Sequence, residues 1–92
     1  MKAKILLLED DLTLNETIVE FLQENDFDVT PVYDGEAASD AIYEKTFDLF
    51  LLDVNVPLIN GFDLLRQKRE DGVTPPAIYI TSLNSIDSLE DG

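Results

Sequence analysis

The chain lacks several residue types, and each absence excludes a class of chemistry. Because it has no cysteine, it can form neither disulfides nor thiolate metal sites. It has no histidine either, which removes the commonest general base, the commonest metal ligand and the usual phosphohistidine carrier. Its apolar runs fall far short of the roughly 20 residues that a membrane-spanning helix needs. Any metal site must therefore be built from oxygen ligands.

Basic residues are also scarce in this sequence. Six lysines and arginines stand against 20 acidic residues, which gives a net charge of −14. Such a field repels nucleic acids and anionic membranes, and it attracts cations and basic protein surfaces. We therefore predict no direct nucleic-acid contact and no membrane partner. The first four residues lead into an apolar run without a cleavage-site pattern, so we expect no signal peptide and a cytoplasmic location.

Length and hydrophobic periodicity indicate one domain, over residues 1–92, in which strands alternate with helices. Short apolar runs predict strands at 4–8, 27–33, 48–54 and 77–81. Helical spacing predicts helices at about 13–25, 36–45 and 62–70, and the start of another at 84–92. The predicted buried residues of the first helix are Leu14, Ile18, Phe21 and Leu22, and those of the third are Phe62 and Leu65.

This alternation predicts an α/β fold with a doubly wound parallel sheet. Pro31 lies inside the second strand, and proline cannot donate a hydrogen bond to a sheet, so that strand should lie at an edge. The first and third strands are apolar on both faces, which is typical of buried central strands. The predicted spatial order of the strands is therefore 2-1-3-4.

Acidic residues follow the two predicted central strands. In an open parallel sheet, ligands bind beyond the carboxyl ends of the strands where the strand order reverses. That point receives Glu9 and Asp10 from the first strand, Asp53 from the third and Thr81 from the fourth. Carboxylates this close must either share a proton or bind a divalent cation. Oxygen ligands of this kind suit Mg²⁺ or Mn²⁺.

A cation beside a carboxylate also permits phosphoryl chemistry. It can neutralise charge while an aspartate attacks phosphorus, which gives an aspartyl phosphate. Asp53 is the best candidate for the nucleophile, and the Thr81 hydroxyl could bind a phosphoryl oxygen. The turn after the first strand carries carboxylates in place of the glycines that a dinucleotide site needs. It should hold a cation rather than a bare phosphate.

Three stretches, "KILLLEDD", "DLFLLDVNVPLINGFDLL" and "PAIYITSL", resemble in order and spacing the receiver domain of two-component response regulators. The resemblance implies a flavodoxin-like fold and phosphorylation of Asp53 by a partner histidine kinase. It implies that Glu9 and Asp10 form the acidic pocket and that Asp10 and Asp53 bind Mg²⁺ directly or through water. It also implies that the backbone carbonyl of Asn55 is a third ligand and that Thr81 is a switch hydroxyl.

The resemblance also implies features that this sequence does not contain. Receiver domains have five strands and five helices, whereas this chain ends inside the predicted fourth helix, without the fifth strand, its lysine or the fifth helix. We therefore expect a partial receiver domain without an output domain. The apolar edge of the fourth strand is expected to favour a homodimer or a rearranged self-association. Phosphorylation by small phosphodonors is expected to be weak, although Mg²⁺ can still bind.

Several residues and two other functions have plainer interpretations. Asp11 is interpreted as a helix cap, Gly61 as an ordinary turn glycine, and Asn55 as a residue that either shapes its turn or borders the site. The main prediction is a switch that a kinase phosphorylates and that is not itself an enzyme, within a parent protein that regulates transcription. The alternatives are a receiver-like interaction module that is not phosphorylated, or a Mg²⁺-dependent phosphohydrolase that forms an aspartyl phosphate.

Overall fold

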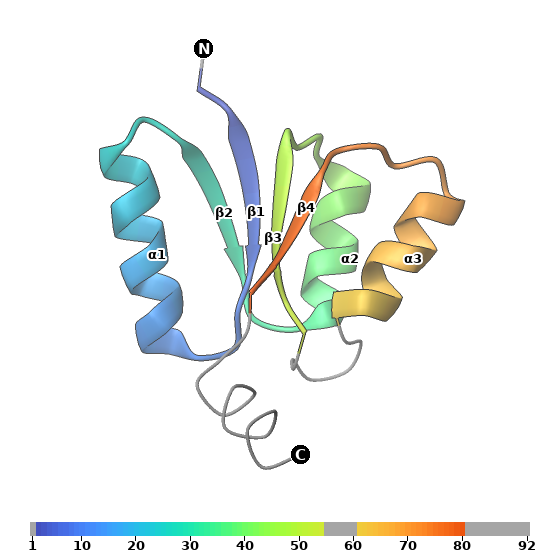
Figure 1. The fold of residues 1–92 in the computed structure, drawn as a ribbon, viewed down its shortest axis with the longest axis horizontal. Helices are drawn as coiled ribbons and strands as arrows, with labels where there is room; N and C mark the ends of the chain where they lie inside the picture. The colour runs from blue at the N-terminus through green and yellow to red at the C-terminus, as the bar shows by residue number, and fades with distance from the viewer. Residues whose placement is uncertain (1, 55–60, 81–92) are drawn as a thin grey trace.

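A computed structural model describes residues 2–54 and 61–80 and shows strands and helices in strict alternation (Figure 1). The strands are β1 (Lys4–Leu8), β2 (Asp28–Val32), β3 (Leu49–Asp53) and β4 (Ala77–Ile80). The helices are α1 (Leu12–Glu24), α2 (Gly35–Glu44) and α3 (Gly61–Glu70). The predictions for Asn55, Thr81 and the helix at 84–92 lie outside the described residues. Within them, no helix has the length and apolar character of a membrane span.

The strands form a parallel sheet in the order β2-β1-β3-β4, which confirms the predicted topology. Helix α1 covers one face of the sheet, and α2 and α3 cover the other (Figure 1). Each helix connects two parallel strands, as a right-handed crossover requires. The reversal of strand order lies between β1 and β3, so the carboxyl ends of these two strands flank the expected ligand crevice.

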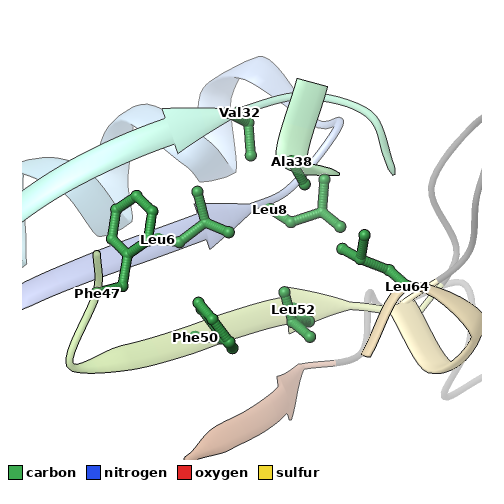
Figure 2. Packing of buried hydrophobic residues seen from close by; sticks show 8 residues of the cluster. All are labelled: Leu6, Leu8, Val32, Ala38, Phe47, Phe50, Leu52 and Leu64. Carbon is green, nitrogen blue, oxygen red and sulfur yellow. The ribbon is translucent and has the colours of Figure 1, made fainter. Parts of the chain in front are cut away.

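The main hydrophobic core lies between the sheet and helices α2 and α3 (Figure 2). Strand β1 is buried on both faces: Leu6 and Leu8 belong to this core, whereas Ile5 and Leu7 face the opposite side. Burial of one such side chain stabilises the fold by roughly 1.5–3 kcal/mol. The core cluster comprises Leu6, Leu8, Val32, Ala38, Phe47, Phe50, Leu52 and Leu64.

Helix α1 begins as predicted but differs in the face that it buries. The Asp11 carboxylate caps the helix by accepting a hydrogen bond from the backbone N–H of Leu14 at 3.0 Å, which confirms the interpretation of Asp11. The prediction for Phe21 is wrong, because its side chain is 63% exposed. The inward face instead includes Asn15, which is 1% exposed and polar. The buried and half-buried residues of α1 lie at positions 14, 15, 18, 19 and 22, so the inward face is rotated away from Phe21.

Helix α3 shows a second correction of the same kind. Phe62 is 54% exposed and packs against Tyr79 of β4, with ring centroids 4.5 Å apart. Leu64 is the fully buried core residue, and Leu65 lies partly buried against the core as predicted. The reason is that the helix begins at Gly61, directly against the end of β3. This close contact sets the helical phase and turns Phe62 toward the sheet edge.

Candidate functional site

Three carboxylates meet at the carboxyl ends of β1 and β3. Because these strands are adjacent and parallel, their ends deliver Glu9, Asp10 and Asp53 to the same edge of the sheet. One carboxylate oxygen from each residue lies within 4.8 Å of the other two. The sequence predicted this convergence from strand order alone, and the geometry agrees with it.

The three acids differ in their burial. Glu9 and Asp53 are each 1% exposed, whereas Asp10 is exposed. Asp53 is the last residue of β3 and pairs with Ile80 of β4, while the preceding residue, Leu52, pairs with Leu8 of β1. The cluster therefore has two enclosed carboxylates and one at its mouth. Asp10 is therefore the carboxylate of the cluster that solvent reaches.

Glu9 occupies an environment that favours its neutral form. Burial raises the pKa of Glu9 from its ordinary value of 4.5 to about 8, and the neighbouring carboxylates of Asp53 and Asp10 contribute to the rise. The backbone N–H of Asp11 opposes it by donating to Glu9 Oε2 at 3.0 Å. A carboxyl group with this pKa is mostly protonated at pH 7 and relieves the like-charge repulsion of the cluster.

The donor set fits a hard divalent cation. The buried Glu9 Oε1 atom has no hydrogen-bond partner in the described part of the chain, and Glu9 shares its cluster with the carboxylates of Asp10 and Asp53. Opposite ligands of a Mg²⁺ ion stand about 4.2 Å apart, because each Mg–O bond is about 2.1 Å. Three oxygens within 4.8 Å can thus share one ion, with a small contraction or an intervening water. A positive charge there would also draw the proton from Glu9.

Two further residues support this cluster, and the sequence did not reveal their roles. Gly61 is buried at the start of α3, and a Cβ atom there would lie 2.7 Å from the backbone carbonyl oxygen of Asp53. The interpretation of Gly61 as an ordinary turn glycine is therefore wrong, because its lack of a side chain allows α3 to approach β3. The position of Gly61, eight residues after Asp53 at a predicted helix start, was the available signal.

Asn15 is the second such residue. Its Nδ2 atom donates to the backbone carbonyl oxygens of Glu9 at 3.0 Å and Val32 at 3.3 Å. The available signal was a lone amide beside Leu14, within the inward face of the first helix. The remaining predicted site residues, Asn55 and Thr81, lie outside the described residues, so their roles stay predictions.

The comparisons with known proteins agree with this geometry. The family model of the response regulator receiver domain matches residues 5–92. This chain belongs to that family. Receiver domains of response regulators act with histidine kinases in two-component systems.

Comparison with individual relatives shows what share of their length this chain covers. The transcriptional regulatory protein CiaR of Streptococcus pneumoniae is 42% identical over 97% of this chain but only 39% of its own length. The receiver thus spans about two fifths of that curated relative. A Francisella response regulator receiver domain has a TM-score of 0.85 at 28% identity, over 99% of this chain and 78% of that one. The MaeR response regulator bound to beryllium trifluoride has a TM-score of 0.80 at 27% identity, over 99% and 75%.

Proposed function

We propose that this receiver domain accepts a phosphoryl group on Asp53 from a histidine kinase in a Mg²⁺-dependent reaction and acts as a conformational switch. The observation that carries the proposal is the acidic cluster. Three carboxylates lie within 4.8 Å of one another, and Asp53 is held among them at the end of a paired strand. The match of the family model to residues 5–92 supports the same function.

The chemistry follows from the position of Asp53. A carboxylate oxygen of Asp53 forms a bond to phosphorus while the bond from phosphorus to the kinase imidazole nitrogen breaks, so that the imidazole leaves as the neutral group after taking a proton. The β3 backbone holds the nucleophile in place, which lowers the entropic cost of the reaction. Glu9 lies buried beside the nucleophile, at 1% exposure.

Glu9, Asp10 and Asp53 would hold the cation, Mg²⁺ or Mn²⁺, with the backbone carbonyl of Asn55 as a further proposed ligand. When bound, the ion supplies positive charge that offsets the developing charge on the phosphoryl oxygens. Asp10, the exposed carboxylate of the cluster, would be the ligand on the solvent side of the ion. Thr81 is proposed to donate its hydroxyl to the phosphoryl group and to shift with the surface around it.

The biological setting is proposed from the relatives. CiaR is a transcriptional regulatory protein, so we infer that phosphorylation of this receiver controls transcription through a parent protein in the cytoplasm. The receiver itself, with a net charge of −14, is not proposed to contact nucleic acid. It serves as the substrate of a kinase and not as an enzyme with a separate substrate.

The test compares Asp53→Asn with Asp40→Asn, an exposed aspartate on α2 that lies outside the cluster. Each protein is incubated with a phosphorylated histidine kinase and Mg²⁺, and the product is followed by intact mass and by its lability in alkali. Wild type and Asp40→Asn should gain one alkali-labile phosphoryl group, and Asp53→Asn should gain none. Equal labelling of Asp53→Asn, or no labelling of wild type by any kinase, contradicts the proposal.

A further inference from the structure

We infer that Asn15 is a positioning residue for the acidic cluster. Its amide holds the backbone of Glu9 against α1 and β2, and thereby sets where the carboxylates of Glu9 and Asp10 stand relative to Asp53. The inference rests on the proposed function for its meaning, since it concerns the geometry of the same cation site. It adds a residue that carries no charge and does not belong to the acidic cluster.

The hydrogen bonds of Asn15 join three elements at one point. The Nδ2 atom donates to the carbonyl oxygen of Glu9, just beyond β1, and to that of Val32, the last residue of β2. The Val32 carbonyl also accepts from the backbone N–H of Glu9 at 3.1 Å. A single amide on α1 therefore connects the helix by hydrogen bonds to the carboxyl ends of β1 and β2, at the backbone of the acidic residue Glu9.

The turn between β1 and α1 is closed by further bonds at both ends. The backbone N–H of Asn15 donates to the Asp11 carbonyl at 2.8 Å, and the Asp11 N–H donates to Glu9 Oε2 at 3.0 Å. Asp10 lies inside this closed turn. Because its side chain is exposed, the hydrogen bonds of the turn and not packing of the side chain hold its backbone in place. If the Asn15 amide is lost, the turn keeps its local bonds and the Glu9 N–H bond to Val32, but the side-chain link between α1 and the two strand ends is gone.

The amide must act as a donor in this place. Both partners of the Nδ2 atom are carbonyl oxygens, so the reversed amide would place Asn15 Oδ1 against two acceptors. Asn15 is 1% exposed, and its Oδ1 atom has no hydrogen-bond partner among the described residues. The side chain thus keeps a buried, unpaired oxygen in order to supply two donors. A residue selected only for packing would be apolar here.

A matched control lies at the other end of the same helix. Asn25 Nδ2 donates to the carbonyl oxygen of Phe21 at 2.8 Å, on the exposed surface and away from the acidic cluster. Asn25→Leu and Asn15→Leu each remove one amide from α1. Any effect that comes only from a weaker helix should appear in both variants. An effect on the cluster should appear only in Asn15→Leu.

The first measurement is Mg²⁺ affinity, determined for the 92-residue chain at pH 8 by following amide resonances during titration with the ion alone. Asn15→Leu should raise the Kd about 10-fold or more, the size of effect seen when supporting residues of metal sites are removed. Asn25→Leu should stay within about twofold of wild type. Asn15→Asp keeps the shape; when ionised it adds a negative charge, which by Coulomb attraction alone would tighten Mg²⁺ binding, and when protonated it supplies one donor where the amide supplies two. Positioning predicts weaker binding for this variant too.

The second measurement needs no metal and separates this inference from the proposed function. Amide hydrogen exchange in metal-free protein should show about 10-fold or greater loss of protection at Glu9 in Asn15→Leu, relative to Leu6 in the same sample. Asn25→Leu should change both amides equally. If wild type binds no Mg²⁺, the proposed function fails, while the exchange result still decides whether Asn15 holds Glu9.

Three outcomes would overturn the inference. One is wild-type Mg²⁺ affinity in Asn15→Leu together with unchanged protection of Glu9. Another is an equal loss of affinity in Asn25→Leu, which would assign the effect to helix stability. The last is tighter Mg²⁺ binding in Asn15→Asp, which would show that charge and not position controls the site. If Asn15→Leu does not fold, Asn15→Asp and its exchange pattern provide the same decision.

Discussion

At the residue scale, the acidic cluster is a group of side chains whose protonation and position are both controlled by their surroundings. Glu9 has a pKa near 8 because it is buried beside other carboxylates. Asp53 depends on the space that Gly61 leaves open, since a side chain there would strike its backbone carbonyl. Both dependences can be measured without a kinase.

The pH dependence of stability follows from Glu9. The folded state holds the Glu9 proton with a pKa of about 8, and the unfolded state with a pKa of 4.5. This group therefore favours folding fully below pH 4.5, and the contribution is lost as the pH rises toward 8. Glu9→Gln should remove this loss and stabilise the metal-free protein at pH 8–9 by roughly 1–3 kcal/mol. Urea unfolding of both proteins from pH 5 to 9 measures the difference.

Because other carboxylates also titrate, only the difference between wild type and Glu9→Gln is assigned to Glu9. Parallel stability curves for the two proteins would show that Glu9 titrates normally. Mg²⁺ should stabilise wild type more at pH 8 than at pH 6, because ion binding displaces the Glu9 proton.

Gly61→Ala tests the close contact between α3 and β3. The new methyl group would lie 2.7 Å from the Asp53 carbonyl oxygen, so α3 or the strand end must move, at a cost of about 1–3 kcal/mol. Gly72→Ala is the control, because Gly72 has φ +88° but open space around it. It should cost about 1 kcal/mol through the backbone alone. Both should lower the urea midpoint, but only Gly61→Ala should weaken Mg²⁺ binding; equal affinities would remove Gly61 from the site.

At the element scale, the capping residues at the helix ends follow from local sequence signals more reliably than the buried faces of the helices do. Asp11 and Asp34 cap α1 and α2 through side-chain bonds to Leu14 and Ala37. Where contact with a strand end or a neighbouring helix decides which face of a helix is buried, the hydrophobic pattern of the sequence assigns a large residue to the wrong face. Phe21 and Phe62 were both expected inside, and both lie at the surface. Apolar residues that fit two phases cannot be assigned from spacing alone.

Asp26, just beyond the end of α1, is a position where a substitution should increase the stability of the protein. Asp26 has φ 66°, a left-handed conformation that glycine adopts at little cost. The N–H of Asp26 bonds to the carbonyl of Gln23, and that of Phe27 to the carbonyl of Leu22, the paired bonds of a Schellman motif. Asp26→Gly should stabilise the protein by up to about 1 kcal/mol, or roughly 4–8 °C in Tm.

The control for this helix end is Asp28→Gly, an exposed residue two positions along, in extended strand β2. Glycine there should destabilise the protein, because an extended strand position does not need the conformational freedom of glycine and glycine loses more entropy on folding. Thermal unfolding by circular dichroism compares the three proteins. A lower Tm for Asp26→Gly would mean that the aspartate makes a compensating interaction.

At the scale of the whole molecule, the sheet has an edge that its own described residues leave open. Among these residues, β4 pairs with β3 alone, while Ile78 is 53% exposed and Tyr79 38% exposed. Such an apolar edge favours pairing with another chain. The net charge of −14 opposes it, so association should strengthen as salt screens the repulsion.

We therefore expect the 92-residue chain to self-associate at tens of micromolar concentration. Ile78→Lys should shift it toward monomer, because a charge on the strand edge blocks pairing. Tyr43→Lys changes a residue that is 89% exposed on α2 and should have no such effect. Light scattering after size exclusion, at low and high salt, gives the masses. A clean wild-type monomer under both conditions contradicts the expectation.

The sequence by itself determined the order of elements, the sheet topology and the convergence of Glu9, Asp10 and Asp53. These follow from short-range signals: apolar strands, a proline that marks an edge, and the rule that parallel strands end at one side. The tertiary structure alone decided the raised pKa of Glu9, the contact that requires Gly61, and the two donors of Asn15. Each depends on atoms from segments far apart in the chain, and a linear pattern does not record their distance.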